Sequence, residues 1–137
     1  MGILFVFPLL AIPAVIYAVL VATRGAGATE YLATQVFAID MAGGTKWVLT
    51  HGHLYIILAI ICLFIEIIKS VRPTTQAMID LSLSVGLFVI MLVMFLLVPG
   101  FGTTEFFLIM LMSILDFMAG AIVMVSSAKR TVEYDRN

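Results

Sequence analysis

Residues 78–127 read MIDLSLSVGLFVIMLVMFLLV, then PGFG, then TTEFFLIMLMSILDFMAGAIVMVSS. A helix of about 20 apolar residues, rising roughly 1.5 Å per residue, crosses a hydrocarbon core of ~30 Å. Both long runs meet that length, and the Pro-Gly pair between them is a strong turn signal. The stretch therefore predicts two antiparallel transmembrane helices, over residues 78–98 and 103–127.

Two further apolar runs, over residues 3–22 and 47–68, bring the number of predicted spans to four. Hydrophobic residues make up 64% of the chain and charged residues 11%, a balance that would expose too much apolar surface in a water-soluble domain of this size. We predict an all-α membrane protein: a single four-transmembrane-helix bundle over residues 1–137, in the bacterial inner (cytoplasmic) membrane.

The first run lacks a basic leader and is longer than the ~7–15 apolar residues of a signal peptide, so we expect a retained transmembrane helix. Pro8 and Pro13 lie inside it and predict a kink or a loosened turn.

Lys and Arg residues predict the orientation of the bundle. Five lie between the second and third spans or in the C-terminal tail, against two on the opposite side. The five are Lys69, Arg72, Lys129, Arg130 and Arg136, and the two are Arg24 and Lys46. The positive-inside rule then places both termini in the cytoplasm. An interfacial aromatic belt of Tyr17, Trp47 and Tyr55 is expected at the outer ends.

The connection between the first two spans contains a helical apolar pattern. Leu32, Val36 and Ile39 recur at i, i+4 and i+7, which predicts a short amphipathic helix over residues 29–41. It is too short to cross the membrane, so we expect it to lie on the outer surface or over the mouth of the bundle.

Charged residues gather at the expected cytoplasmic ends of the second and third spans. Antiparallel packing brings Glu66 and Asp80 to about the same depth, and Lys69 is three residues from Glu66. Partly paired charges of this kind hold helix ends in register. The alternative is an entry site for an ion or a proton.

Asp116 falls near the middle of the fourth span, where an Asp costs about 2.5–3.5 kcal/mol on insertion scales. It must therefore face the bundle, a wet cavity or another subunit. Ser113 and Gly120 share its helix face, and Ser84 on the third span is a candidate partner. The hypotheses are a hydrogen-bonded link between helices and a site for proton relay or cation binding.

His51 and His53 open the second span on the same side as Asp40, and imidazole with carboxylate suits zinc or copper. The i, i+2 spacing, however, sends the two rings to different helix faces. We therefore treat the three as a weak metal or pigment candidate beside ordinary interfacial polar residues, and we predict no cofactor. The single cysteine, Cys62, is interpreted as a packing residue.

These features predict a small non-catalytic accessory or structural subunit of a larger membrane complex or oligomer. Its expected partners are the lipid bilayer and other membrane subunits or further copies of itself. The alternative is a homo-oligomeric proton or cation pathway built on Asp116. A net charge of −1 argues against nucleic acid. Ser113, His51 and Asp116 do not lie at depths that form a catalytic triad, so we predict no enzyme.

Overall fold

A computed structural model describes residues 7–71 and 75–134 of the chain. About 77% of it is helical. The elements in chain order are α2 (Ala11–Arg24), the short 3-10 turn η1 (Gly25–Gly27), α3 (Ala28–Ala33), β1 (Gln35–Asp40), β2 (Lys46–Thr50), α4 (His51–Ser70), α5 (Thr75–Leu97) and α6 (Thr104–Tyr134). The predicted start of the first span at residue 3, Arg72 and Arg136 lie outside the described residues.

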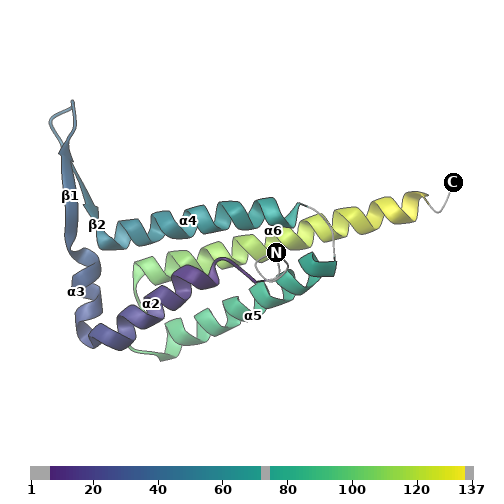
Figure 1. Cartoon of the computed structure of the whole chain (residues 1–137), viewed down its shortest axis with the longest axis horizontal. Coiled ribbons are helices and arrows are strands. Elements are labelled where there is room, and N and C mark those ends of the chain that lie inside the picture. The colour runs from purple at the N-terminus through teal and green to yellow at the C-terminus, as the bar shows by residue number, and fades with distance from the viewer. Residues whose placement is uncertain (1–6, 72–74, 135–137) are drawn as a thin grey trace.

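Four helical segments in the described part of the chain are long and apolar enough to cross a membrane. This is the pattern of a multi-pass integral membrane protein, and it agrees with the predicted number of spans. The first candidate segment is Ala11–Ala33 rather than residues 3–22. In Figure 1 the four helices run alongside one another, and α6 continues beyond the bundle toward the C-terminus. α4 and α5 both pack along α6. One end of the bundle carries Glu66, Lys69 and Asp80 and is called the charged end below; the other, with β1 and β2, is called the hairpin end.

The first helix is shorter than its apolar run. Pro13 is the third residue of α2, and residues 9 and 10 before the helix form a turn. A proline in the first turn costs no helical hydrogen bond, because the N–H groups there have no helical partner. At the other end, Gly25 adopts a φ of 53°, which glycine reaches at no steric cost. The chain turns there, and α3 runs across the direction of α2 (Figure 1).

The prediction of an amphipathic helix over residues 29–41 is wrong for most of its length. α3 ends at Ala33, and residues 35–40 pair antiparallel with residues 46–50 as a two-stranded hairpin. Register pairs such as Phe37 with Leu49 and Ile39 with Trp47 place these four side chains on one face of the hairpin. The second span correspondingly begins as α4 at His51 rather than at residue 47.

Tyr17 lies in the core rather than in an interfacial belt. It is fully buried, and its ring centroid lies 5.0 Å from that of Phe106 and 5.5 Å from that of Phe101. Gly100 has a φ of 93°, and a Cβ there would lie 2.8 Å from a methyl group of Val21. The turn between α5 and α6 therefore needs glycine in order to approach α2.

A buried charged cluster as the candidate functional site

Four ionisable side chains meet inside the bundle, and we call them the charged cluster: Glu66, Lys69, Asp80 and Asp116. Glu66 and Lys69 come from the last turns of α4, Asp80 from the second turn of α5, and Asp116 from the middle of α6. The exposed fractions are 1% for Glu66, 7% for Asp80 and 5% for Asp116. Charged residues are almost never this buried unless they have partners.

Glu66 and Lys69 bind each other and the segment that precedes α2. The Lys69 Nζ atom lies 3.0 Å from Glu66 Oε1 and donates a hydrogen bond to the carbonyl of Phe7 over 3.1 Å. The backbone N–H of Leu9 donates to Glu66 Oε2 over 2.8 Å. The Glu66–Lys69 contact agrees with the sequence prediction, since the residues are one helical turn apart. The two backbone partners could not be predicted, because any residue type supplies the same backbone groups.

Asp80 is less completely satisfied than Glu66. Its Oδ1 atom lies 3.7 Å from Lys69 Nζ, an ion pair that is longer than a hydrogen bond. The same oxygen is buried and has no hydrogen-bond partner among the described residues. Such an atom requires an explanation, because desolvating a carboxylate oxygen without a partner is costly.

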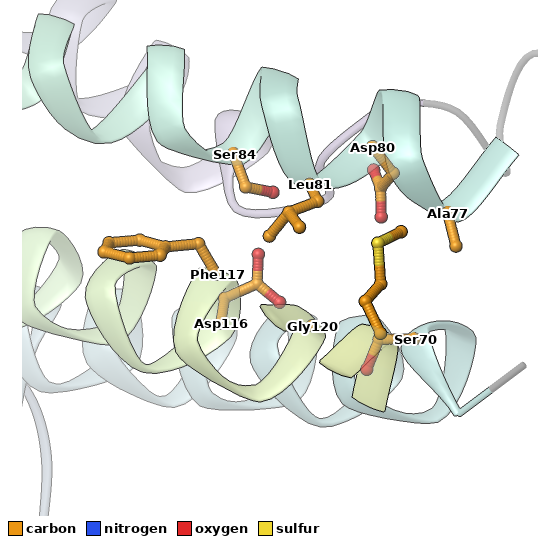
Figure 2. A pocket seen from close by; sticks show the side chains of 9 residues that line it. Ser70, Ala77, Asp80, Leu81, Ser84, Asp116, Phe117 and Gly120 are labelled. Atoms are coloured by element: carbon orange, nitrogen blue, oxygen red, sulfur yellow. The ribbon is translucent and has the colours of Figure 1, made fainter. Parts of the chain in front are cut away.

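A small cavity lies beside this oxygen, between α5 and α6. Figure 2 shows Asp80 and Ser84 reaching into it from α5 and the Asp116 carboxyl reaching up from α6. Asp116 interacts with the Ser84 hydroxyl, which is the partner expected from antiparallel register. The cavity volume is about 10 Å³, close to the ~10–15 Å³ that one water molecule requires.

Ser113 and Gly120, which share the helix face of Asp116, have different roles. Ser113 is buried, but its hydroxyl donates to the Met110 carbonyl of its own helix over 2.7 Å. It does not line the cavity. Gly120 lines the cavity, and a Cβ there would lie 3.3 Å from Leu81 Cδ1. The glycine allows α5 and α6 to approach closely at the depth of Asp116.

Among the described residues, the side chains buried between Asp116 and the hairpin end are mainly apolar. They include Met91, Phe106, Ile109 and Met110, and Ser113 is a buried polar residue one turn from Asp116. The next polar groups are the Tyr17 hydroxyl, which hydrogen-bonds with Thr103 and with the Gly100 carbonyl, and the Tyr55 hydroxyl, which donates to the Pro13 carbonyl. These hydroxyls link α2 to α4 and to the turn between α5 and α6, a role that the sequence pattern does not indicate.

The structure does not bring the candidate metal residues together. His53 caps α4: its backbone N–H donates to the Thr50 hydroxyl, and its Nδ1 accepts from the Thr50 N–H. The His51 Nδ1 atom lies 3.2 Å from the Thr34 carbonyl. Asp40 pairs with Lys46 at the far end of the hairpin, 3.8 Å apart. Within residues 7–71 and 75–130, no three His, Cys, Asp or Glu side chains are placed to hold a metal ion.

Comparison with known proteins assigns no relationship to this chain. No family model, no curated protein and no solved structure matches it.

Proposed function

We propose that this protein is a non-catalytic accessory or structural subunit of a larger assembly in the bacterial inner membrane, with both termini in the cytoplasm. The observation that carries the proposal is the apolar face of the β1–β2 hairpin. Phe37, Ile39 and Trp47 share that face and are 42%, 46% and 45% exposed. The hairpin extends away from the bundle across the direction of its helices (Figure 1).

A two-stranded hairpin is at best marginally stable alone in water. Here it presents aromatic and β-branched side chains on one face and the Asp40–Lys46 ion pair on the other. An exposed apolar patch rimmed by polar residues is typical of an interaction site. The hairpin is therefore suited to hold a neighbouring membrane subunit at the level of the membrane surface.

The test is isolation of the tagged full chain from its native membrane in a mild detergent. We expect a fixed set of other integral membrane proteins in constant stoichiometry, whereas a stable ring made only of copies of this chain would favour the pathway described below. Replacing both Phe37 and Trp47 by Ser should release the partners. Val48→Ser, on the opposite hairpin face, is the matched control. A monomer from the native membrane would overturn the proposal.

The predicted topology has its own test. Reporter fusions after α6 should indicate a cytoplasmic C-terminus, because Lys129 and Arg130 lie in the part of α6 near the charged end. A fusion within the hairpin turn, residues 41–45, should report the opposite side. The reverse pattern would invert the assignment of the two membrane faces.

A second candidate function is a proton or cation pathway in an oligomer of this chain. It is favoured by the Asp80 oxygen that has no hydrogen-bond partner among the described residues, and by the cavity that Asp80 and Asp116 both line. Three carboxylates and one ammonium group give the fully ionised cluster a formal charge of −2, and burying unpaired charge is costly. Uptake of a proton or a cation would relieve that cost. Apolar residues fill the bundle between Asp116 and the hairpin end. A pathway across the membrane would therefore have to run between several copies of the chain.

Flux measurements in liposomes test this alternative. Asp116→Asn retains the shape and hydrogen bonding of the side chain but cannot titrate, so it should abolish proton flux while the fold remains intact. Ser113→Ala, on the same helix outside the cavity, should leave flux unchanged. Equal flux from the wild type and Asp116→Asn, or none from either, would rule out the pathway.

A further inference from the structure

A second cavity lies away from the charged cluster, on the side of the bundle near the hairpin end. It is a groove of about 380 Å³ between α2 and α4, within the ~300–1,000 Å³ range of small-molecule sites. Its walls are apolar: Ile16, Val19 and Leu20 come from α2, and Leu54 and Leu58 from α4. The adjoining Tyr55 hydroxyl is already bonded to the Pro13 carbonyl. The walls therefore favour an apolar occupant.

The end of this groove nearest the hairpin is polar, and a cation lies next to it. Tyr31 and His51 line it, and their rings are stacked with centroids 4.4 Å apart. The Arg24 guanidinium lies over the Tyr31 ring, 3.9 Å from its centroid, a favourable cation–π geometry. None of the ion pairs formed within the described residues involves Arg24. A guanidinium held in place without a carboxylate is well suited to bind a phosphate.

We propose that the groove binds one phospholipid molecule with an anionic headgroup. Its acyl chain lies along Val19, Leu20 and Leu58, and its phosphate lies beside Arg24. Arg24 is the last residue of α2, so the phosphate is placed where a spanning helix reaches the headgroup region, while the groove extends toward the hydrocarbon core. Apolar walls, with a guanidinium stacked on the Tyr31 ring that lines the polar end, match an amphiphile of this kind. The site goes beyond the proposed accessory function and does not depend on it.

Native mass spectrometry of the full chain provides the test. The detergent-solubilised protein is delipidated and titrated with phosphatidylglycerol or with phosphatidylcholine of the same acyl chains. We expect a saturable adduct of one phosphatidylglycerol per chain, and about tenfold weaker binding of phosphatidylcholine. Both headgroups carry a phosphate, but the choline ammonium of phosphatidylcholine offsets its charge and repels the Arg24 guanidinium, so the neutral lipid is attracted less strongly. Equal, non-saturating adducts of both lipids would overturn the proposal.

Two variants with matched controls separate the parts of the site. Leu58→Trp fills the groove and should abolish the one-lipid adduct, whereas Ile60→Trp, at an exposed position of α4 outside the groove, should not. Arg24→Gln should reduce the preference for phosphatidylglycerol about tenfold, whereas Lys46→Gln removes an exposed cation at the hairpin and should leave it unchanged. Retention of the adduct by Leu58→Trp, or equal loss in both tryptophan variants, would contradict the assignment.

A photoactivatable phosphatidylglycerol removes the dependence on variant folding. Cross-linked to the wild-type chain, it should label α2 and α4 at residues of the groove, and excess phosphatidylglycerol should compete. Inorganic phosphate at the same concentration should not compete, because the acyl chain supplies much of the binding. Labelling spread evenly over all lipid-facing helices would show ordinary bilayer contact and would overturn the proposal. A loss of protein partners in Leu58→Trp without any loss of lipid would also overturn it, in favour of a protein occupant.

Discussion

Two ion pairs of nearly equal length lie at opposite ends of this protein. Lys69 and Asp80 are 3.7 Å apart at the charged end, with side chains 9% and 10% exposed. Lys46 and Asp40 are 3.8 Å apart on the hairpin, with side chains 73% and 80% exposed. The first pair is surrounded by further carboxyls and backbone groups, whereas water can solvate the second. The comparison teaches that burial, rather than distance, decides what such a pair contributes to stability.

The largest expected effect is at the charged end. Lys69→Met removes the cation shared by Glu66, Asp80 and the Phe7 carbonyl, and leaves buried carboxylates without compensation. We expect the free energy of unfolding to fall by about 3–5 kcal/mol. Unfolding by a denaturing detergent in mixed micelles, followed by circular dichroism, measures this. A change below about 1 kcal/mol would indicate that the cluster does not act as a buried ion pair.

An intermediate effect is expected in the α5–α6 turn at the hairpin end. Gly100→Ala places a Cβ at a positive φ and 2.8 Å from Val21, which should cost about 1–3 kcal/mol of unfolding free energy. Gly102→Ala is the control, since nothing lies within 4 Å of its Cβ and its φ is not positive. Similar losses in both variants would show that the turn as a whole, and not the approach to α2, limits stability.

A smaller effect is expected at the junction of the hairpin and α4. Thr50→Ala removes the hydroxyl that caps the helix through the His53 N–H and should cost about 1 kcal/mol. Hydrogen exchange should show faster exchange of the amides in the first turn of α4 but not of those near Glu66. Faster exchange throughout α4 would mean that the two ends of the helix are coupled.

The smallest effect is expected on the hairpin itself. Lys46→Met breaks the exposed pair with Asp40 and should change the unfolding free energy by less than about 1 kcal/mol. The unfolding free energy of the variant should depend little on salt concentration. The same micelle titration applies, at low and high ionic strength. A loss as large as that of Lys69→Met would refute the contrast between the two ends.

The membrane architecture could be predicted because a hydropathy pattern averages over many residues. Four long apolar runs are sufficient for four spanning helices, and errors of a few residues at each end do not alter the result. Counting along antiparallel helices also placed Asp116 opposite Ser84, since both runs have the same rise per residue.

The hairpin could not be predicted with certainty, because its apolar residues fit both the helical repeat of about 3.6 residues and a β-strand. Val36 and Ile39 suit a helix together with Leu32, but β-branched and aromatic residues such as Val36, Phe37 and Ile39 also favour a strand. Gly43 and Gly44 lie in the turn that joins the two strands, where Gly44 has a φ of 78°. A glycine pair followed by a second β-branched and aromatic run is a hairpin signal. The sequence therefore contains both a helical spacing and a hairpin signal in the same segment, and the hairpin signal is the one that agrees with the structure.

The partners of the charged cluster could not be predicted in the same way. Glu66 and Lys69 bind backbone groups near residues 7–9, more than 50 positions away. Tyr17 was assigned to an interfacial belt because tyrosine commonly lies there. In the structure its ring packs against Phe101 and Phe106, and its hydroxyl bonds with Thr103. These are contacts of tertiary packing, which the residue type does not reveal.

The backbone contact between Leu9 and Glu66 has a consequence for how the sequence can vary. The donor is a main-chain N–H, which every residue except proline supplies. Substitutions at position 9 are therefore free to accumulate without loss of the contact, provided that proline is avoided. An inserted or deleted residue between positions 9 and 13 would instead shift the donor away from the carboxylate. Homologous chains should thus preserve the spacing of this segment more strictly than its residue types.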